Sequence, residues 1–142
     1  MRISIAIWTT LVAIASSVAI AAHYLQLPLL HWIAKPLATL LIVAMVWSLS
    51  TSEPLYRRWV VIGLLWSTLG DVLLMLPGDY FLYGLLSFLV AHIAYLLAFN
   101  KRERLLARLA PFAIYAVIAV GVLAYLWQGI PAPMRVPVLV YV

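Results

Sequence analysis

Apolar residues along this chain form five long runs, separated by short polar connections. Each run has about the 20 residues that a helix needs to cross the hydrocarbon of a bilayer at 1.5 Å per residue. The connections contain proline, glycine, serine and acidic residues, which favour turns. The sequence therefore predicts five transmembrane helices, over residues 3–22, 28–49, 59–76, 81–99 and 111–127.

The two ends of the chain need separate interpretation. The first run follows Arg2 and resembles a signal peptide, but it is longer than the roughly 7–15 apolar residues of such a peptide, and more spans follow it. We interpret it as a retained span. Residues 134–142 begin a further apolar helix that is too short to cross a bilayer. A helix that ends in lipid leaves its last carbonyl groups unpaired, so we expect the natural protein to continue beyond Val142.

The composition is that of a membrane protein. Hydrophobic residues make up 68% of the chain and charged residues 9%, with a mean hydropathy of +1.14, whereas soluble domains contain about 25% charged residues. The predicted fold class is therefore all-α, a single polytopic transmembrane helical bundle over residues 1–142. It has five full spans and the start of a sixth. The chain has no cysteine, which excludes disulfides and thiolate chemistry within this sequence.

The basic residues are distributed unevenly between the two ends of the predicted helices. With the N-terminus in the cytoplasm, only Lys35 and Arg135 fall toward the outer side, and the positive-inside rule favours this orientation. We therefore predict the bacterial inner membrane, with a cytoplasmic N-terminus and no binding of nucleic acid. The cytoplasmic set is Arg2, Arg57, Arg58, Lys101, Arg102, Arg104 and Arg108.

Ionisable residues lie inside three consecutive apolar runs: Lys35, Asp71 and His92. A charged side chain in the middle of a bilayer costs roughly 2.5–3.5 kcal/mol on insertion scales, so such residues are functional candidates. At 1.5 Å per residue, Lys35 lies about 10 Å and Asp71 about 8 Å below the same surface, with His92 about 16 Å deep. We predict that all three project into one cavity between the second, third and fourth runs.

Helical spacing places further polar residues on the same faces. His31 and Thr39 lie one turn before and after Lys35, and Ser67 lies one turn before Asp71. Ser87 and Tyr95 adjoin the face of His92. Pro36 is expected to interrupt the second helix and to free a carbonyl group that protein or water must satisfy.

Structural explanations compete with the functional ones. Lys35 could extend to the membrane surface, His92 could bond a neighbouring helix, and Asp71 could form a structural ion pair with Lys35. We interpret His23 and His31 as interfacial loop residues. The glycines of the third and fourth runs suit close helix packing: Gly63, Gly70 and Gly84. Asp71 and His92 are one ligand short of a catalytic zinc site, so no metal or other cofactor is predicted.

Three blocks of residues carry a family resemblance. They are 35–41 (KPLATLL), 70–76 (GDVLLML) and 81–95, where the pattern is FxxGxxSFxxAHxxY. In order and spacing they resemble the YhhN-type lysoplasmalogenase family. The resemblance covers roughly residues 30–100 closely. It implies a bundle of about eight helices and a later GAxxFxxSD block, with a second aspartate, beyond Val142.

The resemblance also implies an activity: hydrolysis of the vinyl-ether bond of lysoplasmalogens, which yields a fatty aldehyde and a glycerophospho-ethanolamine or -choline. That reaction needs a proton donor for the alkene carbon and a base for water. A carboxyl group in apolar surroundings holds a proton well, whereas a neighbouring ammonium has the opposite effect. A phosphate-binding Lys35 and a proton-donating Asp71 therefore conflict.

A membrane lipid of the lysophospholipid type is thus the expected partner, and this piece of chain alone is not expected to hold the complete site. The alternative function is a small-solute or proton-coupled carrier, because intramembrane ionisable residues also build proton relays and a helix broken at Pro36 would suit a transport path. The candidate catalytic residues are Asp71 and His92, and the candidate substrate-binding residues are Lys35, Thr39, Ser87 and Tyr95.

Overall fold

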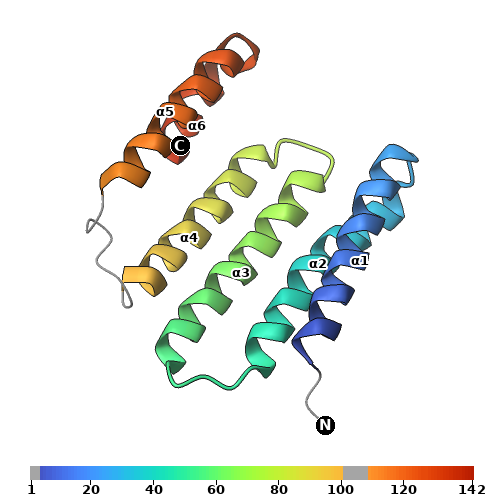
Figure 1. Cartoon of the computed structure of the whole chain (residues 1–142). Coiled ribbons are helices and arrows are strands. Elements are labelled where there is room, and N and C mark those ends of the chain that lie inside the picture. Colours follow the sequence, from blue (N-terminus) through green and yellow to red (C-terminus); the bar gives the residue numbers. More distant parts are fainter. Residues whose placement is uncertain (1–3, 101–108) are drawn as a thin grey trace.

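The computed structural model describes residues 4–100 and 109–142 (Figure 1). Over these residues the protein is helical and contains no strand, as the sequence predicts. Six α-helices and one short 3₁₀ helix follow in order: α1 (Ile5–Tyr24), α2 (Pro28–Ser48), α3 (Pro54–Met75), α4 (Phe81–Asn100), α5 (Leu109–Leu126), η1 (Trp127–Gly129) and α6 (Ala132–Tyr141).

Helices α1 to α4 are each long and apolar enough to cross a bilayer. The fifth predicted run contributes a shorter apolar stretch, 113–129, among the described residues, so a fifth full span stays a prediction. The basic segment 101–108 and Arg2 lie outside the described residues.

Two local predictions were wrong. Helix α3 begins at Pro54, five residues before the predicted span. Proline fits the first position of a helix, where no amide partner is lost, and Arg57 donates to the carbonyl of Leu49 at 3.1 Å across the connection. Helix α2 also runs unbroken from Pro28 to Ser48 with Pro36 inside it, so Pro36 does not divide the second helix into two.

Helices α1 to α4 form a row of antiparallel neighbours (Figure 1). Each packs on the next along the chain, α1 on α2, α2 on α3 and α3 on α4. The α1–α2 and α3–α4 connections lie at one end of the row, and the α2–α3 connection lies at the other, where the described chain begins. Helix α6 packs against α4. This order places α2 between α1 and α3, so one cavity can draw residues from all three helices.

Small residues make the contacts between the helices. In the described part of the chain, the buried apolar positions are alanines and one valine, and no large side chain is fully buried. Large apolar side chains cover the outside instead, as a bilayer requires. Within the α3–α4 pair, a Cβ atom added to Gly70 would lie 2.7 Å from the ring of Phe88, and one added to Gly84 would lie 2.7 Å from Leu74. The interpretation of these glycines as close-packing positions is confirmed.

Candidate functional site

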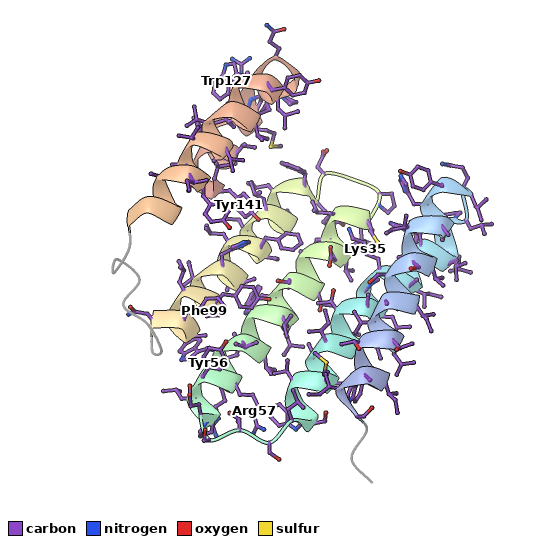
Figure 2. All side chains as sticks on the ribbon, viewed as in Figure 1. Lys35, Tyr56, Arg57, Phe99, Trp127 and Tyr141 are labelled. Carbon is purple, nitrogen blue, oxygen red and sulfur yellow. The ribbon has the colours of Figure 1, made fainter. Side chains whose placement is uncertain are left out.

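An ion pair joins α2 to α3 in the middle of this row. Lys35 Nζ lies 3.1 Å from Asp71 Oδ1, and the Thr39 hydroxyl donates a longer bond, 3.5 Å, to Asp71 Oδ2. The Lys35 side chain is 36% exposed and the Asp71 side chain 19% exposed, so the carboxylate is the more shielded partner. Figure 2 shows Lys35 between α2 and α3, in the half of the row nearer the α1–α2 connection. The depths estimated from the two helix ends therefore match.

These three residues line a cavity of about 590 Å³ that α1, α2 and α3 enclose in part. The volume lies within the range of about 300–1,000 Å³ that small-molecule sites occupy. Most of the lining comes from the hairpin of α1 and α2, and we call it the hairpin cavity. Its lining residues are Ser16, Ala19, Ile20, His23, Tyr24, His31, Lys35, Ala38, Thr39 and Asp71.

Two histidines line the end of the hairpin cavity nearest the α1–α2 connection. His31 Nδ1 donates to the carbonyl of Ala19 on α1 at 2.8 Å, and the His31 ring lies 5.3 Å, centroid to centroid, from the His23 ring. Both residues belong to helices, so their interpretation as loop residues was wrong, while an interfacial position stays a prediction. The polar stripe of α2 gave a signal for His31, but no pattern in the sequence placed α1 against it.

His92 lies elsewhere. It is exposed on α4, where its Nδ1 donates to the carbonyl of Phe88 at 2.6 Å. Its ring meets the edge of the Tyr141 ring of α6 at a centroid distance of 5.6 Å, and Figure 2 shows Tyr141 beside α4. His92 is not among the residues that line the hairpin cavity. Lys35 and Asp71 do share a cavity, but α1 completes it and α4, which was predicted to do so, does not. The predicted convergence is wrong for His92, because α4 turns this side chain toward α6.

The other two candidates on α4 also lie outside the hairpin cavity. The Tyr95 hydroxyl shares a hydrogen bond of 3.1 Å with Ser67 of α3, and the Tyr95 ring covers Gly63. Ser87 is buried, donates to the carbonyl of Tyr83 at 2.9 Å and lines a separate, largely apolar cavity of about 750 Å³ along α3 and α4. The structure thus divides the predicted site residues into two groups.

The hairpin cavity offers a shielded carboxylate, an ammonium, two imidazoles and the hydroxyl groups of Ser16, Tyr24 and Thr39. This set can bind an anion, donate or accept protons, and position a water molecule. Among residues 4–100 and 109–142, no three His, Cys, Asp or Glu side chains form a group suited to a metal ion.

Long apolar helices with an ion pair between them define the class: an integral membrane protein of the all-α, polytopic kind. The sequence profile of the YhhN family matches residues 30–142, and the chain belongs to that family. The matched region contains α3, α4 and all of α2 except its first two residues, and with them every predicted site residue.

Known relatives agree with this assignment. An uncharacterized membrane protein YhhN of Escherichia coli O6:H1 is 28% identical over 97 residues, which cover 68% of this chain and 46% of that protein. Proteins named lysoplasmalogenase from Mycobacterium bovis and Mycobacterium tuberculosis are 34% identical over 93 residues, covering 61% of this chain and 36% of each. The chain thus spans less than half the length of these relatives. No solved structure matches it.

Proposed function

We propose that the protein carrying this sequence is a membrane-embedded hydrolase that cleaves the vinyl-ether bond of lysoplasmalogens. The observation that supports it most is the Lys35–Asp71 pair inside a cavity of ligand size between apolar helices. The similarity to proteins named lysoplasmalogenase supports this choice of reaction. A lipid substrate suits a site that only membrane-spanning helices surround.

The reaction adds water across the vinyl ether. A proton is added to the alkene carbon farther from oxygen, the resulting oxocarbenium ion takes up water, and the hemiacetal collapses to an aldehyde and the glycerol hydroxyl. Asp71 is our candidate for the acid–base group, because it is the shielded carboxyl group of the hairpin cavity. As a carboxylate it can also stabilise the oxocarbenium ion and accept a proton from the attacking water.

Lys35 and Thr39 supply the polar contacts on α2. In this structure both side chains contact Asp71. A phosphate that binds Lys35 would place a second anion beside the ammonium and weaken the ion pair between Lys35 and Asp71. Lys35 can then bind substrate while Asp71 acts in proton transfer, so the two roles act in sequence and no longer conflict. His92, Ser87 and Tyr95 stay candidate site residues, through contacts other than those of the hairpin cavity.

The proposal includes an orientation in the bacterial inner membrane. We place the N-terminus and the α2–α3 connection in the cytoplasm, because Arg57 and Arg58 begin α3 there. The α1–α2 and α3–α4 connections then face outward, and the hairpin cavity lies in the outer half of the bilayer. Cysteine at Ser52 should resist an impermeant thiol reagent added to intact cells, while cysteine at Gly78 should react. Labelling at Ser52 alone would invert the orientation.

The structure removes one argument for the carrier alternative. A broken helix at Pro36 would have suited a transport path, but α2 is continuous through Pro36. The intramembrane ionisable residues remain compatible with a carrier.

Turnover separates the two functions. The complete natural protein, purified and reconstituted, should release fatty aldehyde from lysoplasmalogen, with a saturated 1-O-alkyl lysophospholipid as the matched control that has no vinyl ether to cleave. Aldehyde from the first lipid only is the expected result. Uptake of a solute into proteoliposomes without any aldehyde would replace the hydrolase with a carrier.

A further inference from the structure

The end of the hairpin cavity near the α1–α2 connection is rich in side chains that can carry positive charge. His23 of α1 lies there with His31 of α2, and Lys35 follows one helical turn farther along α2. We propose that His23, His31 and Lys35 form a subsite for the phosphate group of a single-chain ether phospholipid. The inference rests on the proposed function and adds to it the means by which the headgroup is recognised.

Hydrogen bonding fixes the orientation of His31. Because a carbonyl oxygen only accepts, the 2.8 Å contact with Ala19 places a proton on His31 Nδ1. Nε2 is then the nitrogen left to gain a proton, and as N–H it can donate to an anion. The adjacent His23 ring, 5.3 Å away between centroids, provides a second imidazole. Two imidazoles this close can bind one anion between them.

The balance of charges in the cavity favours an anionic ligand. Its titratable lining consists of His23 and Tyr24 from α1, His31 and Lys35 from α2, and Asp71 from α3. The only carboxylate among them contacts Lys35, at 3.1 Å. When the histidines take up protons, they add positive charge that no carboxylate of the lining balances. A phosphate diester, with one negative charge and several acceptor oxygens, fits this need.

Position along the helices supports a lipid phosphate in particular. Helix α1 ends at Tyr24 and α2 begins at Pro28, so His23 and His31 lie within about one turn of the hairpin end. Lipid phosphates lie at the surface of a bilayer, where this end of the hairpin is expected. Lys35 lies about 6 Å farther along α2, four residues at 1.5 Å each, and contacts Asp71 of α3 there. A phosphate on the histidines therefore places the glycerol, and the ether bond attached to it, toward Asp71.

A non-hydrolysable lipid measures binding without turnover. The complete natural protein in maltoside micelles, which contain no phosphate, is titrated with 1-O-alkyl-glycerophosphocholine from pH 5.5 to pH 8. Three probes separate the parts of that lipid: 1-O-alkylglycerol lacks the phosphate, glycerophosphocholine lacks the chain, and inorganic phosphate lacks the chain, the glycerol and the choline. We expect the phospholipid to bind at least roughly tenfold more tightly than alkylglycerol, since a hydrogen bond to a charged group contributes about that much.

The pH profile tests the histidines. Phospholipid binding should weaken as the pH rises, because imidazole loses its charge between about pH 5 and 8, and alkylglycerol binding should stay constant. The His23→Gln/His31→Asn double variant should bind the phospholipid roughly tenfold to a hundredfold more weakly at pH 5.5 and lose the pH dependence. Asparagine keeps a donor for the Ala19 carbonyl, and thermal unfolding of the variant checks that it is folded.

Two further variants complete the design. His31→Lys keeps a cation at this position at every pH, so it should bind tightly with a smaller pH dependence, to which only His23 still contributes. Arg58→Gln removes an exposed cation at the other end of the helices and should bind as the natural protein does. Equal affinity for phospholipid and alkylglycerol would overturn the subsite, and so would an intact pH profile in the double variant. Inorganic phosphate binding as tightly as the lipid would replace the lipid subsite with a site for soluble phosphate.

Failure of this inference can be told apart from failure of the proposed function. If phosphate-dependent binding is present but lysoplasmalogen yields no aldehyde, the hydrolase is wrong and the phosphate subsite stands. If aldehyde is released but the double variant binds and responds to pH normally, the hydrolase stands and the subsite is wrong.

Discussion

The hairpin cavity and the cluster of Ser67, His92, Tyr95 and Tyr141, which we call the α4 cluster, differ in how their polar groups are paired. In the hairpin cavity, Lys35 and Asp71 place opposite charges 3.1 Å apart in a space of about 590 Å³. In the α4 cluster, the polar groups contact each other or the backbone, as in the 3.1 Å hydrogen bond of Ser67 with Tyr95.

The difference indicates which region suits chemistry. Neutral interhelical hydrogen bonds are ordinary packing devices in membranes, whereas a charge in the bilayer is costly and is kept where it functions. We therefore assign proton transfer and headgroup binding to the hairpin cavity. The α4 cluster holds α3, α4 and α6 together in the described structure.

The largest effect is expected from Asp71→Asn in the complete protein. The amide keeps the shape of the side chain but cannot supply or accept the proton, so aldehyde release should fall by about 10²–10⁴-fold, the usual contribution of general acid–base catalysis. A steady-state assay in micelles measures this. The variant must first elute as a folded species, since removal of a buried charge changes stability as well. A folded Asp71→Asn protein with normal turnover would remove Asp71 from the mechanism.

Lys35→Ala should have the next largest effect, and mainly on KM. Loss of a charged contact to phosphate weakens binding by roughly tenfold to a hundredfold, while the carboxyl group that transfers the proton remains. Kinetic measurement of kcat and KM separates the effect on turnover from the effect on binding. Lys35→Arg, which keeps the charge, is the matched control. A fall in kcat alone, at unchanged KM, would contradict phosphate binding by Lys35.

His92→Ala should have the smallest effect of the three. His92 lies on the exposed face of α4 against Tyr141, so its removal should lower turnover by less than roughly tenfold if it only packs. The same aldehyde assay measures it beside Asp71→Asn. Losses of equal size in the two variants would show that both regions take part in catalysis, and the contrast between them would fail.

The sequence predicted the helices well and the site in part. Runs of apolar residues placed each helix to within a few residues, except at Pro54, where the polar first turn of α3 lies outside the apolar run. Lys35 and Asp71 were paired correctly because a fixed rise per residue gives depth in a membrane, and α2 and α3 are neighbours along the chain.

Which helix lies against each face of another helix could not be predicted in the same way. A helical stripe gives the direction of a side chain relative to its own helix, but not which other helix lies there. Ala91 packs inside the molecule while His92, the next residue, faces outward. Helix α1 has no ionisable residue before His23, so nothing in its sequence indicated that Ser16, Ala19 and Ile20 line the hairpin cavity.

The central claim is that the lipid substrate occupies the hairpin cavity, and photocrosslinking tests it most directly. A 1-O-alkyl lysophospholipid with a diazirine on the first carbons of its chain is bound to the complete natural protein and irradiated, and the labelled peptides are identified by mass spectrometry. We predict labelling within residues 16–24 of α1 and 31–39 of α2, reduced by excess unlabelled lipid. Competable labelling confined to α4 and α6, with α1 and α2 unlabelled, would contradict the account.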